Sequence, residues 1–419
     1  MKVELQINNS VSALARFVTW APSPCRIRVT DPSGTTATAV TVQLSSVSTA
    51  TAGAVTFRQG TTGTFANTLS LAVPVNGTSV PFFIAGKFGQ PSTTNGDVKI
   101  EARVKFSAST PPTLVGSTTL MVRVRKSTES MTTAERDRFV NAFGKLNNQG
   151  QGRFQDFRDM HATSAALAQA HGAAGFLPWH RAYLLDLERE LQAIDPSVTL
   201  PYWRFDQAAP KLFTRDFFGV SDQNGRVQFS NTNPLQFWKT DGFLGINRSP
   251  FFSTSQAPPG LFNENQTFTL GGQNNLYRLF RRMEGNPHGS AHVSFGGFIH
   301  DPPTAPKDPL FFLLHCNVDR LWAKWQLQNG RFDRTVAAAY DSNPPNGNQI
   351  GHNLADTMWP WNGVTVPPRP PTAPGGTLAA SDCTSAPGPQ PQVQDCLDYH
   401  GVINPLARMG FDYDDVRFA

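Results

Sequence analysis

The sequence of 419 residues lacks several features that mark large classes of protein. It has no run of about 18 or more apolar residues, so no membrane-spanning helix is predicted. Only 16% of its residues are charged, and Lys and Arg do not gather into the basic stripe of a nucleic-acid-binding protein. The four cysteines are too few for a disulfide scaffold, although Cys383 and Cys396 close a short loop that an oxidising compartment would allow to pair. We therefore expect a globular protein with neither a nucleic acid nor a membrane as partner.

The first residues, Met1 to Leu5, lack the basic stretch and apolar core of a secretory signal. We expect a cytoplasmic protein, or an exported one whose signal lies on a partner or has been removed.

Residues 1–125 show the alternating pattern of β-strands. Segment 98–106 alternates apolar and charged residues, and segments 25–29, 40–44 and 120–125 behave alike. Turn-forming clusters separate these segments, as expected for an all-β sandwich of Ig-like type. The same residues hold 11 Lys+Arg and 4 Asp+Glu, a net +7, against 25 and 27, a net −2, for the rest of the chain. A solvated strand face explains this basic excess more simply than an acidic partner does.

The pattern becomes helical after Lys126, where we place the domain boundary. Thr132 and Glu135 have the spacing of a capping box, and apolar residues then follow at helical intervals. We predict a mainly α-helical domain over residues 126–419, with a Pro-rich loop at about 360–392.

Six of the nine histidines fall into two groups of three. They are His161, His171 and His180, then His288, His292 and His315. His180 and His315 lie on apolar stripes of predicted helices, and His288 and His292 are four residues apart, so both rings point the same way if that segment is helical. Buried polar rings need partners, and separately satisfied core histidines compete here with a metal site.

The donor set narrows the choice of metal. Neither group supplies a cysteine pair, as structural zinc requires, or the Glu-x-x-His pattern of di-iron bundles. Three neutral imidazoles for each ion suit copper, while a zinc hydrolase with three histidines remains the alternative.

Two long segments resemble the tyrosinase family of type-3 copper proteins. The first runs from His171 through Phe176-Leu177-Pro178-Trp179-His180-Arg181, with His161 upstream. The second contains His288-Gly289-Ser290-Ala291-His292 and the segment from Asp308 through His315 to Trp322. The resemblance covers about residues 127–419 and leaves residues 1–125 unassigned.

The resemblance implies a four-helix-bundle core that holds two copper ions. It implies that His161, His171 and His180 bind the first copper, and that His288, His292 and His315 bind the second. It also implies O2-dependent oxidation of catechols or o-aminophenols to o-quinone-type products, and ortho-hydroxylation of monophenols. The expected partners are a phenolic small molecule and O2.

Several positions depart from the family pattern. Leu314 replaces a histidine that often precedes the last ligand, and Gly289 replaces an asparagine of efficient phenol hydroxylases. Gln169 stands where some relatives have a cysteine crosslinked to a ligand histidine, so no thioether is expected at His171. Glu284 resembles a family glutamate that orients water and helps remove the phenolic proton, although its spacing to His288 is shorter. The alternative for Glu284 is a surface residue at a helix end.

Other side chains have simpler expected roles. Phe176, Phe295 and Phe298 line an aromatic pocket or pack in the core. Asp319 binds a ligand imidazole or an arginine, and Cys316 is a buried structural residue. We expect surface or structural roles for His300, His352 and His400.

These observations predict a two-domain copper oxidoreductase of the tyrosinase, catechol oxidase or o-aminophenol oxidase type. The alternatives are a reversible dioxygen-binding protein, a zinc-dependent hydrolase, and a β-module that binds a partner beside a degenerate helical domain.

Overall fold

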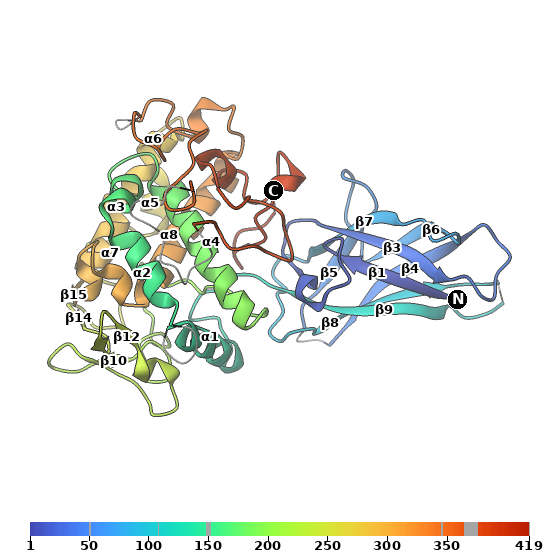
Figure 1. Ribbon diagram of the computed structural model, residues 1–419, viewed down its shortest axis with the longest axis horizontal. Helices are drawn as coiled ribbons and strands as arrows, with labels where there is room; N and C mark the ends of the chain where they lie inside the picture. The colour runs from blue at the N-terminus through green and yellow to red at the C-terminus, as the bar shows by residue number, and fades with distance from the viewer. Residues whose placement is uncertain (50–51, 108, 148–151, 345–346, 364–375, 419) are drawn as a thin grey trace. The chain divides into compact units, whose positions relative to one another are not determined.

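The computed structural model describes the chain except residues 50–51, 108, 148–151, 345–346, 364–375 and 419 (Figure 1). The described chain forms two compact units. The strand-rich unit contains Met1–Val124, Ser381–Ser385 and Arg408–Phe418, and the helical unit contains Arg125–Ala380 and Ala386–Ala407. This confirms the layout of strands followed by helices. The expected single division near Lys126 differs from it, because two segments of the C-terminal tail belong to the strand-rich unit.

The strand-rich unit is built from two sheets. Their strand orders are β1-β3-β7-β5 and β2-β9-β8-β4-β6. The strands are β1 (Lys2–Ile7), β2 (Phe17–Val18), β3 (Ser23–Asp31), β4 (Ala39–Ser48), β5 (Val55–Arg58), β6 (Thr68–Pro74), β7 (Val80–Gly86), β8 (Val98–Val104) and β9 (Thr113–Val122). Ile27 of β3 and Leu44 of β4 belong to one core cluster, so residues from both sheets share a single apolar interior. The Ig-like type of this sandwich stays a prediction.

Alternating burial follows the sequence along β3, where Cys25, Ile27 and Val29 are buried and the residues between them are exposed. The alternation fails at the end of β9, where Leu120, Met121 and Val122 are all buried. The C-terminal tail supplies the reason. Cys383 packs with Met121 and Phe17, so the face of β9 that would otherwise meet water is covered within the same unit.

The α-helices of the described chain lie in the helical unit, as the sequence predicted. They are α1 (Thr133–Asn147), α2 (Phe154–Ala162), α3 (Ser164–Ala170), α4 (Phe176–Ile194), α5 (Glu264–Thr269), α6 (Tyr277–Phe280), α7 (Ser290–Val293) and α8 (Leu310–Asn329). The predicted capping box at the start of α1 is confirmed. The Thr132 backbone N–H donates to the Glu135 carboxylate at 2.9 Å, and the Glu135 N–H donates to the Thr132 hydroxyl at 3.2 Å.

Short strand pairs lie in the loops of this unit. They are β10 (Val220–Ser221) with β11 (Val227–Gln228), β12 (Lys239–Thr240) with β13 (Phe243–Leu244), and β14 (Arg248–Pro250) with β15 (Phe295–Gly297). Residues 364–375 of the expected Pro-rich loop at about 360–392 lie outside the described residues, and residues 360–363 and 376–391 form neither helix nor strand. Within the described part of the chain, no helix is both long enough and apolar enough to cross a membrane.

Helices α4 and α8 are buried on all sides rather than along one stripe. Every residue of α4 from Phe176 to Leu191 is buried, as is nearly every residue of α8 from Leu310 to Gln326. Charged residues inside these helices are therefore paired. Arg181 of α4 donates from Nε to Asp319 of α8 at 2.6 Å. This pair fixes the two helices that carry His180 and His315.

Candidate metal centre

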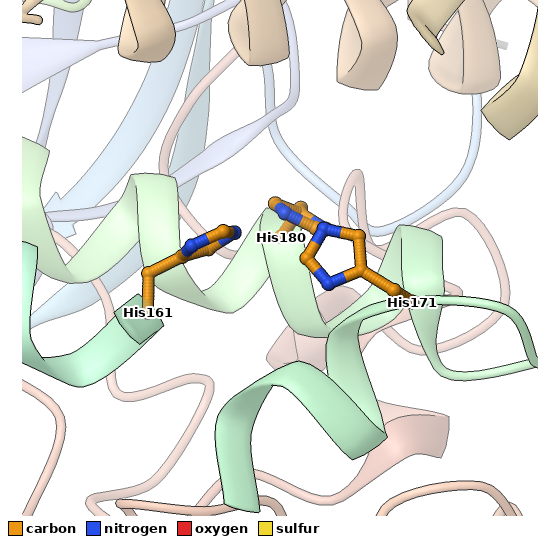
Figure 2. Close-up of side chains that lie close together, drawn as sticks. All are labelled: His161, His171 and His180. Carbon is orange, nitrogen blue, oxygen red and sulfur yellow. The ribbon is translucent and has the colours of Figure 1, made fainter. Parts of the chain in front are cut away.

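The first histidine group comes from three consecutive segments. His161 lies in the last turn of α2, His171 directly follows α3, and His180 lies in the first turns of α4. One ring nitrogen from each comes within 4.8 Å of the others. Figure 2 shows the three rings turned toward one another. His161 and His180 are fully buried, and His171 is half-buried.

The second group is tighter. His288 lies in a π-type turn, Gly285–Gly289, that continues directly into α7, which carries His292. His315 enters from α8. The Nε2 atoms of His288 and His292 each lie 3.2 Å from Nε2 of His315. The structure therefore brings together all three residues that the sequence placed in this group.

The two groups lie side by side. The rings of His180 and His315 are stacked, with centroids 4.1 Å apart and an interplanar angle of 15°. Phe176 packs against His180 at 5.0 Å and against His288 at 4.9 Å, so it also contacts both groups. Ions bound by the two groups would be immediate neighbours, as a dinuclear centre requires.

Backbone carbonyls determine which ring nitrogen faces the centre. The Nδ1 atoms of His180, His288 and His292 lie 2.8, 2.7 and 2.7 Å from the carbonyl oxygens of Phe176, Glu284 and Ile299 respectively. A carbonyl oxygen only accepts, so Nδ1 carries the proton in each ring. Each Nε2 is then left with a lone pair directed toward its group.

Burial favours the neutral rings that metal binding needs. It is the largest cause of a lowered pKa in all six imidazoles, because the charged imidazolium loses its hydration. The pKa falls to about 4 for His171 and for His292. Protons therefore compete weakly for these nitrogens at neutral pH.

Hydrogen bonds inside the protein do not satisfy these nitrogens. His288 and His292 both present a lone pair to Nε2 of His315, and one proton on His315 cannot serve both. In the first group, Nε2 of His161 and Nε2 of His180 are buried without a hydrogen-bond partner among the described residues. A cation in each group would satisfy these atoms. Three neutral imidazoles without thiolate or carboxylate fit copper.

A cavity of about 160 Å³ opens onto both groups. Its walls are mainly apolar apart from histidine side chains, and no described acidic residue lines it. The ring of Phe311 lies 4.9 Å from that of His161 and 4.1 Å from that of His315, so it forms the floor between the groups. The lining is completed by His171, His288, Gly289, His292, Val293, His300, Pro302 and Ala305. A planar aromatic ring is the kind of ligand that such walls accommodate.

Buried ion pairs join the helices that carry His180 and His315. Asp319 lies one turn after His315, and it accepts hydrogen bonds from Arg181 at 2.6 Å and from Arg125 at 3.2 Å. Arg125 also binds Glu188 at 2.8 Å. Of the two expected partners of Asp319, the structure therefore shows arginine. Asp319 acts on the site through the position of α8 against α4.

Glu284 connects the two histidine groups. Its side chain accepts a hydrogen bond from the Gly172 N–H at 2.7 Å, directly after His171, while its carbonyl accepts from His288. Burial raises the pKa of Glu284 to about 7. The carboxyl is half-buried and bound, unlike a free surface residue at a helix end, but it does not line the cavity.

The aromatic candidates separate into two kinds. Phe176 lies between the histidine groups, as described above. Phe295 packs in a cluster with Trp203, Phe213 and Phe252, and Phe298 packs against Phe243 at 5.4 Å. The latter two are packing residues, and Phe311 is the aromatic side chain that the cavity exposes.

The remaining candidates have structural environments. His352 accepts from the Gly175 N–H at 3.3 Å and has Nε2 3.1 Å from the Ala168 carbonyl, so it holds the loop that carries His171. His400 is buried against Tyr399, with ring centroids 4.0 Å apart. Gln169 accepts from the Trp359 N–H at 2.8 Å. Cys316 is buried, and no disulfide joins any of the four cysteines, Cys383 and Cys396 included, in the described structure.

Two departures seen in the sequence have local consequences. Leu314 is buried, and Nδ1 of His315 has no hydrogen-bond partner among the described residues. Gly289 lines the cavity and offers it no side chain.

Sequence reasoning missed one residue of the site. His300 lines the cavity, although nothing in the sequence pairs it with another histidine. It follows β15 in a short 3-10 turn, Phe298–His300, and only the folding of this turn back over α7 brings it to the cavity. The signal available in the sequence was that His300 lies close to His288 and His292.

Comparison with known proteins gives a consistent family. The sequence profile for the common central domain of tyrosinase matches residues 151–328. The chain is 33% identical over 265 residues to a tyrosinase of Streptomyces glaucescens, which covers 57% of this chain and 92% of that protein. It is 31% identical over 271 residues to grixazone synthase of Streptomyces griseus, covering 50% of this chain and 86% of that protein. Among solved structures, deoxygenated hemocyanin from Rapana thomasiana aligns with a TM-score of 0.49 at 23% identity, covering 70% of each chain.

Proposed function

The chain belongs to the tyrosinase family of type-3 copper proteins, and from this premise we propose that it oxidises catechols or o-aminophenols with O2 to o-quinone-type products. Members of this family bind a dinuclear copper centre, and the two histidine groups offer six imidazole donors for it. We also propose His161, His171 and His180 as ligands of one copper, and His288, His292 and His315 as ligands of the other. The helices that present them, α2, α4, α7 and α8, would form the four-helix core.

One observation carries the proposal. Two groups of three neutral imidazoles meet through the stacked rings of His180 and His315, beside a cavity of about 160 Å³. Copper, when bound, supplies the one-electron steps and the binding of O2 that these side chains cannot provide. The protein's own contribution is to fix the rings, exclude bulk water and admit a flat substrate.

The cavity residues define how a phenolic ring is held. Phe311 and Val293 offer apolar surface for the ring, and Gly289 leaves room beside the second group. Because Gly289 has no side chain to hold a water molecule, the site favours substrates that already carry two ortho donor groups. We therefore rank catechol and o-aminophenol oxidation above monophenol hydroxylation.

Glu284 is the acid–base candidate of this site. A carboxyl group with a pKa of about 7 can both accept and return a proton near neutral pH. Its hydrogen bond from Gly172 places it next to the first group, within reach of a water molecule rather than in the cavity wall. We propose that Glu284 takes the phenolic proton through such a water.

Glu284→Gln tests this role, because the amide keeps the shape and the acceptor for Gly172 but cannot take up a proton. Monophenol hydroxylation should fall by about 10²- to 10⁴-fold, with a smaller loss on catechols. The measurement is kcat on both substrate classes across pH 5–9, with copper content as the control. Unchanged hydroxylation would reject the role.

The function itself is tested with copper-loaded protein and a panel of monophenols, catechols and o-aminophenols. We expect O2 uptake with one O2 consumed for every two catechols oxidised to quinone, and water as the other product. Protein loaded with zinc serves as the matched control and should be inactive on all three classes.

The alternatives give different results in the same experiment. Reversible O2 absorption without catechol consumption would make the protein an oxygen carrier. Ester or amide hydrolysis by the zinc-loaded protein, with no oxidation by the copper-loaded one, would make it a hydrolase.

A further inference from the structure

His300 is the histidine of the cavity that belongs to neither metal-binding group. It is half-buried in the turn that follows β15, and it lines the same cavity as His288, His292 and Phe311. The preceding residue, Ile299, holds His292 through its carbonyl oxygen. The backbone at this turn therefore serves the second group, while the side chain of His300 serves the cavity.

The hydrogen bond at Nδ1 defines the chemistry of the His300 ring. Nδ1 lies 2.7 Å from the carbonyl oxygen of Phe295, which only accepts, so Nδ1 carries a proton. In the neutral ring Nε2 is then an acceptor. No residue in the described part of the chain makes a hydrogen bond to this Nε2, and the atom is not fully buried.

The surroundings make an acceptor here selective. Gly289, Val293, Pro302, Ala305 and Phe311 offer no side-chain hydrogen bond to a ligand. The other histidines of the cavity are proposed copper ligands. A ligand that carries a donor group away from the metal therefore finds its acceptor at His300.

We infer that His300 is a positioning residue that accepts a hydrogen bond from a substituent of the aromatic substrate, a hydroxyl or amine that is not bound to copper. This inference rests on the proposed function, because it takes the cavity as the substrate site. It assigns a substrate class: catechols or o-aminophenols with an additional donor group on the ring or on a short side chain.

The test compares two ligands of similar shape. Hydroxymethylcatechols carry the donor, and the corresponding ethylcatechols replace its oxygen with a methyl group, with the substituent at ring position 3 or 4. The quantity measured is the ratio of affinities within each pair, which cancels effects common to both ligands. For the position that reaches His300, loss of the acceptor should lower this ratio about two- to tenfold.

Two substitutions separate positioning from a structural role. His300→Asn places an amide near Nδ1, so it keeps the bond to Phe295 but removes the acceptor at Nε2. His300→Gln places an amide oxygen near Nε2 and gives up the bond to Phe295. We expect discrimination to be lost in His300→Asn and retained in His300→Gln, whereas a purely structural role predicts damage from His300→Gln instead. Asp301→Asn, on the exposed neighbour, is the control.

Affinity is measured by calorimetric titration of the copper-loaded, reduced protein without O2, so that binding does not depend on turnover. KM and kcat with O2 provide a second readout, in which KM should change and kcat should not. If the wild-type protein binds both pairs with the same ratio as His300→Asn at both positions, the inference is wrong. If the ratio depends on His300 but no phenol is oxidised, His300 binds as inferred and the proposed function is wrong.

Discussion

The two units of this chain differ in where their ion pairs lie. In the strand-rich unit, Arg28 pairs with Glu4 on the outer side of alternating strands. In the helical unit, the buried Arg181 pairs with Asp319, and the buried Arg125 pairs with both Asp319 and Glu188. The unit that carries the histidine groups therefore contains a network of buried ion pairs.

This difference has a physical reason. A sandwich needs an apolar interior, and period-two alternation provides it. A metal centre needs imidazoles at fixed positions in the interior, so the helices that carry them must be held in place by buried contacts. The ion pairs next to His180 and His315 supply such contacts at a desolvation cost.

The largest expected effect comes from removing one ligand. His315→Ala should reduce the copper bound per chain from two ions to one and abolish catechol oxidation, since the second group cannot bind with two imidazoles as it does with three. Copper is measured by atomic absorption after dialysis. His400→Gln, which changes a buried histidine of the same unit outside both groups, should keep both ions. If His315→Ala retained two ions, the ligand assignment would be wrong.

Acid should then separate the two units in the copper-free protein. Burial lowers the pKa of His171 and His292 from 6.5 to about 4. Between these pH values the two imidazoles are protonated in the unfolded chain but stay neutral in the folded unit. The free energy of unfolding of the helical unit should therefore fall as the pH falls from about 6.5 toward 4. Glu284, Asp395 and Asp398 have raised pKa values and act in the opposite sense, but they are three carboxyls against six imidazoles.

The strand-rich unit should respond at lower pH. Hydrogen bonds from Arg28 lower the pKa of Glu4, and those from Lys99 and Arg103 lower the pKa of Glu101. Their stabilisation is present above the ordinary pKa of 4.5 and is lost as the pH falls through the lowered values. Amide exchange followed by mass spectrometry between pH 7 and 4 should show loss of protection in α4 before β3. Simultaneous loss in both would contradict the comparison.

The sequence predicted the layout, several elements and the membership of both histidine groups. It did so because strand alternation, the Thr132–Glu135 capping box and the spacing of the histidines are local features. It did not predict that Ser381–Ser385 and Arg408–Phe418 belong to the strand-rich unit, because Cys383 reaches Phe17 across more than 360 residues of chain.

The burial of charges in α4 and α8 was also beyond the sequence. Periodicity assigns Arg181 and Asp319 to no particular face once all faces are buried, and only their pairing in space explains why they are tolerated. The sequence did not identify His300 as a cavity residue for a related reason: its turn reaches the cavity only when α7 and β15 have packed.

The buried pairs give the next largest effect. Asp319→Asn leaves the guanidinium groups of Arg181 and Arg125 without their shared carboxylate, and should lower the free energy of unfolding by about 3–5 kcal/mol. Copper affinity should fall with it, because α4 and α8 lose their fixed spacing. Urea denaturation and copper titration measure the two quantities. Asp137→Asn, at the exposed pair with Arg136, should change stability by less than about 1 kcal/mol.

The smallest effect, and the sharpest separation of the units, is expected at Asp412. This residue is fully buried in the strand-rich unit, where its Oδ2 accepts from the Ala21 N–H at 3.1 Å, while the Tyr413 carbonyl accepts from the indole of Trp20 at 2.8 Å. Asp412→Ala leaves the Ala21 N–H buried and unsatisfied, which should destabilise this unit by about 1–3 kcal/mol.

Asp412→Asn keeps an acceptor oxygen and should lose less. In both variants, amide exchange should quicken in β3 and β7 while copper content and the protection of α4 stay unchanged. This outcome would show that the tail stabilises the sandwich without supporting the metal centre. Loss of copper in Asp412→Ala with an intact sandwich would instead mean that the tail acts on the helical unit, and the division of labour between the two units would have to be redrawn.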